Sequence, residues 1–458
     1  MPTLRIIADD HARLRAHLFP GDGLEAPAIL VCARSGRDGS QLLVKDMILV
    51  PYETCDVRRP DRLTWPGAYL ERAVDIADTF DGSVVLAHSH PGGYYGFSSL
   101  DDASDRQTVP VLQAGVSGSN DLHGSAIMTP DGRLMCRVYN EVMRAKSCSA
   151  IWSIGHDIAD LTRPGLRPLA YSSAMTQDLR RHVAVVVGVS GTGSLVAEML
   201  VRLGVGHIVL VDYDRVERRN LNRILNATPA DVGRFKTHVV RDAIRAIDPT
   251  VVVETFETPI VTPSTLTATS DGTVLFSCVD SVAGRYYCDL MVESFLCPLI
   301  DVGVMIPTRT VGAHREIADV CGRIDYVRPG GVSLWSRGEI TGESLSAEYV
   351  RQIDVEAYEQ QVREGYLQGV PEESPSVISL NMRAASAAVH EWLARLYPIR
   401  HSPNEGFAKT YFSLAAGEED HLPESSMGEP RRSDLFARGL RAPLLGVPGT
   451  GTSTRSAA

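Results

Sequence analysis

The chain has 458 residues, which at about 150 residues per domain predicts two to four domains. Hydrophobic residues make up 44% and charged residues 22% of the sequence, a composition typical of a globular protein and not of a disordered or fibrous one. The formal net charge of -11 argues against a general nucleic-acid binder, because binding to phosphates requires a basic surface.

The cysteines are scattered and form no C-x-x-C pair, which indicates reduced thiols in a cytoplasmic protein. The N-terminal stretch MPTLRIIADDHARLRAHLF carries early acidic residues and lacks the apolar centre of a secretory signal. Nowhere do about 18 uncharged apolar residues follow one another, as a membrane-spanning helix requires. We therefore expect a cytoplasmic protein with no nucleic-acid or membrane partner.

The first part of the chain has the pattern of an α+β domain. Apolar runs at residues 26–50 and 83–87, separated by glycine and aspartate turns, predict short strands, and residues 67–80 have helical spacing. We expect this domain at residues 1–145. Residues 146–180 include the stretch LTRPGLRPL and are expected to form a linker or docking segment.

The pattern changes at residue 182. The stretch HVAVVVGVSGTGSLVAEMLVRLGVGHIVLVDYD predicts a strand, a glycine-rich turn, a helix and a strand, the first βαβ unit of a doubly wound parallel sheet. VVVETFE, GTVLFSCVD and CPLIDVGV predict further strands, and residues 236–246, 283–295 and 375–397 predict helices. We therefore expect an α/β, Rossmann-like domain over residues 181–400. Residues 401–458 are expected to be a C-terminal extension with a disordered end.

The stretch HSHPGGYYGFSSLDDASD, residues 88–105, contains the ligand types of a metal site. His88 and His90 lie two residues apart on a predicted strand and therefore point to the same side. Asp101, eleven residues further on, can return across a loop to complete a three-ligand zinc site with a fourth position for water. An H-x-H pair alone is weak evidence, because a histidine on an apolar strand is more often a satisfied core residue.

The longer pattern H-x-H-x7-S-x-x-D, which adds Ser98, resembles the signature of the JAMM/MPN metalloproteases. The resemblance implies that Glu25 is the general base that takes a proton from the zinc-bound water. It also implies that the Ser98 hydroxyl helps to hold the oxyanion. Glu53, in the turn-like stretch PYETCD, is an alternative base that ranks below Glu25, and a family fold without metal is the alternative reading of the site.

A second site is predicted at GVSGTGS, because such glycine turns bring backbone amides at a helix N-terminus to a pyrophosphate. This turn and Asp212 after the next strand also fit an NAD-dependent dehydrogenase. The stretches DYDRVERRNLNR and SCVDS, with Lys236 between them, favour a nucleoside triphosphate instead. Arg223 and Lys236 supply cations for phosphate oxygens, and Asp280 supplies a carboxylate for magnesium.

This set of motifs resembles the ThiF/MoeB superfamily, the adenylating domains related to ubiquitin-activating enzymes. The resemblance implies an ATP site made by the glycine loop, the ribose acid and the second acid of D-x-D, the N-L-x-R element, the phosphate lysine and the C-x-D acid. In that order these residues are Gly188, Gly191, Gly193, Asp212, Asp214, Asn220, Arg223, Lys236 and Asp280.

The sequence departs from this family pattern at several places. Ser190 replaces a usual glycine, and Ser333 and Ser336 stand where a zinc-binding C-x-x-C pair is expected, so we expect no second zinc ion. No arginine stands at Ser172 and Ser173, where a dimer-supplied arginine is expected, and the possible substitutes are Arg163 and Arg167.

Cys321 lies in the region where activating enzymes carry a thioester-forming cysteine. Arg315 and Arg323 would lower its pKa, whereas Glu316 and Asp319 would oppose them. An ordinary strand cysteine is the favoured reading, as it is for Cys278 and Cys297.

Together these motifs predict a bifunctional enzyme of a prokaryotic ubiquitin-like system, with Zn²⁺, Mg²⁺ and ATP as cofactors. A zinc peptidase would process or deconjugate a ubiquitin-like protein, and the second domain would adenylate its C-terminal glycine. A conjugating-enzyme-like protein is a possible further partner, and the family resemblance implies a homodimer. One alternative is adenylation of a small carboxylate or peptide in natural-product or sulfur-transfer chemistry. The other is a non-catalytic dimeric scaffold that presents the peptidase.

Overall fold

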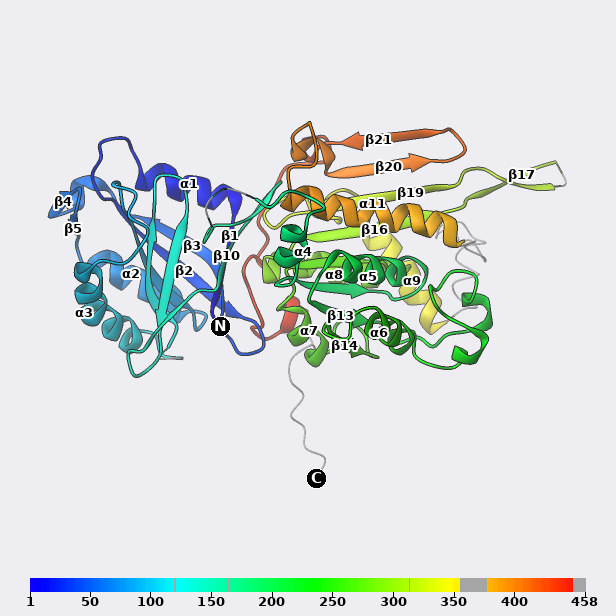
Figure 1. Cartoon of the computed structure of the whole chain (residues 1–458), viewed down its shortest axis with the longest axis horizontal. Helices are drawn as coiled ribbons and strands as arrows, with labels where there is room; N and C mark the ends of the chain where they lie inside the picture. Colours follow the sequence, from blue (N-terminus) through cyan, green and yellow to red (C-terminus); the bar gives the residue numbers. More distant parts are fainter. Residues whose placement is uncertain (119–120, 164, 166, 313, 355–376, 448–458) are drawn as a thin grey trace, which may run out of the picture. The chain divides into compact units, whose positions relative to one another are not determined.

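A computed structural model describes residues 1–118, 121–163, 165, 167–312, 314–354 and 377–447. The chain divides into two compact units, each built on its own sheet (Figure 1). The first unit contains Met1–Arg167, Glu293–Leu296 and a segment that begins at Ser433. The second contains Pro168–Val292 and Cys297–Arg432. In the described part of the chain, no helix combines the length and apolar character needed to span a bilayer.

The first unit is a mixed nine-stranded sheet with the order β11-β10-β1-β3-β2-β6-β7-β8-β9. Its strands are β1 (Thr3–Ile7), β2 (Pro27–Ser35), β3 (Gln41–Leu49), β6 (Ser83–Ser89), β7 (His123–Met128), β8 (Leu134–Tyr139), β9 (Ala145–Ser147), β10 (Ala150–Ile154) and β11 (Ile158–Asp160). A separate ribbon and three helices complete the unit: β4 (Val57–Arg59), β5 (Arg62–Thr64), α1 (Ala8–Leu18), α2 (Ala68–Asp78) and α3 (Ser99–Gly115).

Strand β2 is apolar from Pro27 to Ala33, where both faces of the sheet are covered. Ala28 and Leu30 belong to a core that includes Leu14 and Leu18 of α1. The alternate residues of β2 join a second core, formed with α2 and α3 on the opposite face. Successive side chains of a strand point to opposite faces, so a run such as AILVC supplies both cores at once. The strands expected at residues 26–50 and 83–87 and the helix expected at 67–80 are therefore present.

Strands β10 and β11 and most of β9 lie within the expected linker at residues 146–180. Strand β10 pairs in parallel with β1, and β11 pairs antiparallel with β10, so the first unit continues to Arg167. The stretch AIWSI is fully buried in the unit, which explains its apolar composition. The sequence expectation ended the domain too early because a five-residue apolar run does not reveal its distant partner strand.

The second unit is an eight-stranded sheet with the order β14-β13-β12-β15-β16-β19-β20-β21. Its strands are β12 (Val183–Val187), β13 (His207–Val211), β14 (Val252–Phe256), β15 (Val274–Ser277), β16 (Leu299–Met305), β19 (Cys321–Val327), β20 (Lys409–Ser413) and β21 (Glu418–Leu422), and a separate hairpin consists of β17 (Thr308–Val311) and β18 (His314–Ile317). Its helices are α4 (Ser173–Leu179), α5 (Gly191–Leu203), α6 (Lys236–Ile247), α7 (Pro263–Thr269), α8 (Val282–Phe295), α9 (Gly342–Ile353) and α11 (Ile378–Leu396).

Five neighbouring strands of this sheet, in the order β14-β13-β12-β15-β16, are parallel. The chain adds strands outward from β12 to β14 and then returns to the other side of β12 with β15, so the strand order reverses between β12 and β15. The carboxyl ends of strands at such a reversal form the crevice in which open α/β sheets bind ligands. This is the doubly wound, Rossmann-like arrangement that the sequence predicts. Helix α11 packs against α5 and against strands β16 and β19.

The segment after residue 400 is not one separate extension. Strands β20 and β21 extend the second sheet, whereas the chain from Ser433 onward belongs to the first unit. There Phe436 and Ala437 join a small core with Ile7 and Leu43, and Lys45 Nζ donates to the Phe436 carbonyl over 2.6 Å. The expectation of a disordered end concerns residues 448–458, which lie outside the described residues.

Candidate metal centre and nucleotide site

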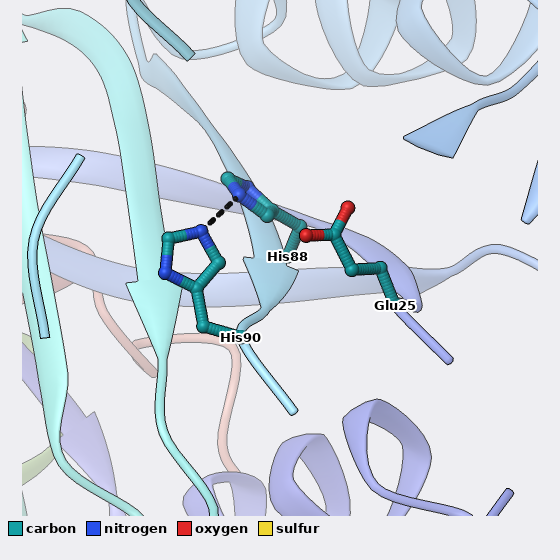
Figure 2. A group of neighbouring side chains, drawn as sticks. All are labelled: Glu25, His88 and His90. Carbon is teal, nitrogen blue, oxygen red and sulfur yellow. Dashed lines mark hydrogen bonds between the residues drawn. The ribbon is translucent and has the colours of Figure 1, made fainter. Parts of the chain in front are cut away.

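Two elements of the first sheet bring Glu25 and the two histidines together (Figure 2). His88 lies near the end of β6, and β2, which follows Glu25, pairs with β6 so that Pro27 lies opposite His88. Two hydrogen bonds continue this pairing beyond the strands: Ser89 N donates to the Ala26 carbonyl over 3.1 Å, and Ala26 N donates to Ser89 Oγ over 2.8 Å. Glu25 is therefore held beside His88 by backbone pairing.

The two ring nitrogens and the Asp101 carboxylate form a compact triangle. His88 Nε2 lies 3.0 Å from His90 Nε2 and 3.1 Å from Asp101 Oδ1, and His90 Nε2 lies 3.7 Å from Asp101 Oδ2. Zinc bonds of about 2.0 to 2.1 Å in a tetrahedral arrangement put neighbouring ligand atoms roughly 3.3 Å apart. The donor set and its spacing therefore fit a zinc ion.

A hydrogen bond outside the triangle orients the His90 ring. His90 Nδ1 lies 2.8 Å from the Tyr94 carbonyl oxygen, which can only accept, so Nδ1 carries the proton and Nε2 presents its lone pair. Burial lowers the pKa of His90, which favours the neutral imidazole that a metal requires. Tyr94 follows the glycines of the loop that carries the chain from β6 to α3.

Asp101 is fixed by the start of helix α3. Ser98 is the N-cap residue: its hydroxyl accepts from Asp101 N over 3.2 Å, and Ser98 N donates to Asp101 Oδ2 over 2.5 Å. Burial raises the pKa of Asp101, but the hydrogen bond and charge of His88 outweigh it and hold that pKa below its usual range. The geometry thus gives Ser98 a part in positioning Asp101, and the oxyanion role stays a prediction.

Glu25 has the surroundings of a general base. Its side chain is buried, and this burial raises its pKa to about 7. One Glu25 oxygen and one ring nitrogen of each histidine lie within 4.8 Å of one another, so Glu25 and Asp101 both lie within reach of an ion between the rings. The alternative base Glu53 is exposed on a short 3₁₀ turn, Tyr52–Thr54.

The second unit contains a cavity of about 480 Å³ at the carboxyl ends of β12, β13 and β15. Its wall includes nearly every nucleotide-site residue predicted from the sequence: Gly188, Gly191, Asp212, Asp214, Asn220, Arg223, Lys236 and Asp280. Gly193 is the exception. A Cβ atom at Gly193 would lie 1.8 Å from the Gly188 carbonyl oxygen, so this glycine lets helix α5 approach the end of β12.

Asp212 holds the loops that follow β12 and β13 at the cavity. Its two carboxylate oxygens accept from Val189 N over 2.7 Å and from Asp214 N over 2.8 Å. Burial raises the pKa of Asp212. The same carboxylate lines the cavity, where it can accept from a ribose hydroxyl, as sequence analysis predicts.

Charged side chains line part of the cavity, beside an apolar part that includes Val187, Val211 and Ile260. Lys236 Nζ donates to Asp214 Oδ2 over 2.7 Å, and Arg223 Nη1 donates to the Arg219 carbonyl over 3.2 Å. Asn220 Oδ1 accepts from Glu217 N over 2.9 Å, which fixes the short turn that carries Arg223. Asp280 is exposed just beyond β15, and carboxylate oxygens are the ligands that Mg²⁺ takes in such sites.

The substitution at Ser190 is compatible with the loop. Ser190 is the N-cap residue of α5 with φ -97° and ψ -135°, and this negative φ does not require glycine; Ser190 also lines the cavity.

Sequence analysis missed several residues of the cavity wall, among them Arg285 and Asn381. Arg285 Nη2 donates to the Val279 carbonyl over 2.9 Å and thereby holds the residue before Asp280. The sequence does show Asn381 as an amide on an Ala-rich, apolar helix face. It could not show that Asn381 lies at the cavity, because the residue is far along the chain from the glycine loop.

Cys321 is a buried strand cysteine in the structure. It lies at the start of β19, paired with Met305 and Ser413, and its thiol points to the Met305 carbonyl at 3.7 Å. The guanidinium of Arg323 contacts Asp301, Asp325 and Glu339, and that of Arg315 donates to Thr308 Oγ1 over 3.0 Å. These contacts support the ordinary reading of Cys321.

Buried carboxylates hold the loop that contains Ser333 and Ser336, which stand in place of a zinc-binding C-x-x-C pair. Asp289 accepts from Leu334 N over 2.9 Å and from Trp335 N over 3.2 Å, while Glu424 accepts from Val332 N over 2.9 Å. Ser333 and Ser336 hydrogen-bond to each other through their hydroxyls at 3.1 Å. The backbone amides of Val332, Leu334 and Trp335 therefore donate to carboxylates of the protein.

Comparison with known proteins assigns a family to each of the two parts of the chain. Residues 8–139 match the family described as prokaryotic homologs of the JAB domain, and residues 166–316 match the ThiF family. The chain is therefore a JAB-homologue domain followed by a ThiF domain, the fusion that the sequence motifs indicate.

Similar individual proteins match in part only. Ubiquitin-like modifier-activating enzyme 5 of Drosophila persimilis is 32% identical over 170 residues, 34% of this chain and 41% of that protein. The enzyme of that name from Caenorhabditis elegans is 32% identical over 169 residues, 34% of this chain and 38% of that protein. The chain thus spans about two fifths of the length of these relatives. The crystal structure of E. coli MccB with ATP is similar with a TM-score of 0.42 and 15% identity, covering 57% of this chain and 68% of that chain.

Proposed function

We propose that the protein is a bifunctional enzyme of a ubiquitin-like system. Its JAB-homologue domain is a zinc peptidase that exposes or releases the C-terminal glycine of a ubiquitin-like protein. Its ThiF domain activates that glycine as an acyl adenylate at the expense of ATP. Both reactions act on the same end of one polypeptide, which gives a reason for their fusion in one chain.

The observation that carries the proposal is that one chain holds two complete constellations. In the first unit the ring nitrogens of His88 and His90 lie 3.0 Å apart, beside Asp101 and Glu25. In the second unit one cavity is lined by the ribose acid, the phosphate cations and the magnesium acid predicted from sequence. The match to the JAB-homologue and ThiF families supports the same assignment.

In the peptidase, His88, His90 and Asp101 are the residues that would hold zinc. The ion supplies a Lewis acid that polarises the scissile carbonyl and lowers the pKa of water. The Glu25 carboxylate accepts the proton of the attacking water and passes it to the leaving nitrogen, so that one water is consumed for each bond broken. The raised pKa of Glu25, about 7, suits a group that both takes and returns a proton.

In the adenylating domain the chain's own residues position two anions for reaction. Asp212 holds the ribose, and Arg223 and Lys236 contact phosphate oxygens at the N-terminal end of α5. Asp280 would hold Mg²⁺, which offsets charge on the phosphates. The substrate carboxylate attacks the α-phosphorus in line, an acyl adenylate forms, and pyrophosphate leaves. The ion pair with Asp214 holds the Lys236 ammonium group at the cavity wall.

The proposed partners follow from the same resemblance. The substrate is a ubiquitin-like protein that ends in glycine, a conjugating-enzyme-like protein would receive it, and the chain would work as a cytoplasmic homodimer. Sequence similarity to ubiquitin-like modifier-activating enzyme 5 supports a ubiquitin-like substrate.

The test is exchange of labelled pyrophosphate into ATP. We expect exchange with a glycine-ended ubiquitin-like protein and none without a carboxylate substrate, and Asp280→Asn should abolish it. Asp420→Asn, which changes an exposed carboxylate on β21, is the control. Exchange with a small acid but not with the protein would favour the natural-product alternative. An absence of exchange with every substrate would favour the scaffold.

A further inference from the structure

Arg137, on strand β8, joins the first sheet to the start of helix α3. Its side chain is 11% exposed. Its guanidinium carbon lies 3.8 Å from the centre of the Phe97 ring, Nη1 donates to Asp102 Oδ1 over 2.6 Å, and Nε donates to Asp105 Oδ2 over 2.9 Å. Arg137 lies outside the pattern H-x-H-x7-S-x-x-D that identifies the metal centre.

These contacts enclose the turn that carries Asp101. Phe97 stands immediately before Ser98, and Asp102 stands immediately after Asp101. The guanidinium of Arg137 therefore contacts the chain on both sides of the capping box that Ser98 and Asp101 form. A flat guanidinium can do this because its face stacks on an aromatic ring while its edge donates to carboxylates.

Asp105 fixes the same helix one turn further on. It is only 3% exposed, and besides Arg137 it accepts from the Ser125 hydroxyl over 2.6 Å and from the Tyr139 hydroxyl over 2.8 Å. Asp101 and Asp105 are an i, i+4 pair and lie on the same face of α3. The helix face that presents Asp101 to the metal centre is thus tied to strands β7 and β8.

The same strands are in register with the strand that carries His88. Strand β7 pairs with β6 so that Ser125 lies opposite Leu86, and with β8 so that Ser125 lies opposite Arg137. Leu86 and His88 are alternate residues of β6, so His88, Ser125 and Arg137 project from one face of the sheet. Arg137 therefore fixes the position of Asp101 relative to His88.

We propose that Arg137 is a positioning residue of the metal centre: it holds the first turn of α3 so that the Asp101 carboxylate can bind an ion between His88 and His90. The proposal rests on the zinc-binding function proposed above and adds to it a residue that is not itself a ligand. Removal of a nearby cation raises the affinity of a site for a positive ion by electrostatics alone. A loss of zinc affinity on removal of Arg137 therefore reports the position of Asp101 and not the charge.

The experiment measures the zinc affinity of the full chain by competition with a chelator. Arg137→Gln removes the charge and the flat guanidinium, and we expect the affinity to fall about 10-fold or more, as for other residues that orient a metal ligand. Arg106→Gln, which removes an exposed cation from the same helix, should stay within about 2-fold of wild type.

The same substitution in an Asp101→Ala background separates positioning from a general effect on the fold. This background leaves the two rings and Glu25 to bind zinc, and titration calorimetry measures the weaker affinity. Arg137→Gln should lower it no further, because the ligand that Arg137 positions is absent. An equal fall in both backgrounds would overturn the proposal, since Arg137 would then only stabilise the unit. Unchanged or higher affinity in the single variant would overturn it as well.

Thermal unfolding identifies a variant that does not fold. Arg137→Lys then takes the place of Arg137→Gln, because it keeps the charge without the flat group that meets Phe97 and both carboxylates, and the same two results are expected. If the wild-type chain binds no zinc, the peptidase function proposed above fails, which distinguishes that result from a failure of Arg137 alone.

Discussion

Lys236 Nζ donates to Asp214 Oδ2 over 2.7 Å within the nucleotide cavity, and its side chain is only 9% exposed whereas that of Asp214 is 55% exposed. The lysine is therefore enclosed by the protein, and the carboxylate is the more solvated partner. A buried cation that is fixed before phosphate arrives loses little further freedom on binding. This relationship makes Lys236 the cation whose loss should affect adenylation most.

We predict that Lys236→Ala lowers the rate of pyrophosphate exchange by roughly 10²-fold or more, because it removes a cation from the transferring phosphates. The measurement is the exchange rate at saturating ATP. Arg245→Ala removes a cation from the exposed side of the same helix and should leave the rate near wild type. A similar loss in both variants would mean that α6, and not its lysine, is responsible.

Metal analysis tests the first unit. Purified protein should carry about one zinc ion per chain. His88→Ala should lose it because a ring ligand is missing, whereas Glu25→Ala should keep it and lose cleavage of a precursor. His314→Ala, which removes an exposed histidine of β18, is the control. The assignment of Glu25 as base is wrong if zinc is lost from the Glu25 variant as completely as from the His88 variant.

Part of the candidate metal site could be predicted from the sequence because its information is local. His88 lies on β6 and His90 follows that strand directly, while Ser98 and Asp101 share one helix start, so spacing alone keeps each pair together. Contacts between residues far apart in the sequence have no local pattern that predicts them. Strand β10 pairs with β1 although most of the first unit lies between them in the sequence, and Asn381 lies beside Gly191 because α11 packs on α5. Contacts of this kind depend on the packing of the whole domain, and single-sequence patterns do not contain it.

Asp289, which accepts hydrogen bonds from the loop at residues 334–335, predicts how the stability of the protein depends on pH. Burial raises the pKa of Asp289 from 3.8 to about 6 in the folded protein. The unfolded chain then ionises at lower pH than the folded one, so this carboxyl contributes stability at low pH that is lost as pH rises from 3.8 to about 6.

Asp289→Asn removes this titration. Its effect on the free energy of unfolding, measured by urea denaturation, should therefore be more destabilising at pH 5 than at pH 7, by about 1 kcal/mol or more. Denaturation of Asp420→Asn, with an exposed carboxyl, should show no such trend. A constant difference between Asp289→Asn and wild type across this range would show that burial does not shift this group.

The most direct measurement of the central claim is pyrophosphate exchange by Glu25→Ala with two substrates, a glycine-ended ubiquitin-like protein and the same protein with a short C-terminal extension. The wild-type chain should exchange with both, because its peptidase removes the extension and exposes the glycine. Glu25→Ala should exchange with the glycine-ended form at the wild-type rate and with the extended form about 10²-fold more slowly. Equal exchange with both forms by Glu25→Ala, or loss of exchange with the glycine-ended form, would contradict two separate sites that act in sequence on one polypeptide end.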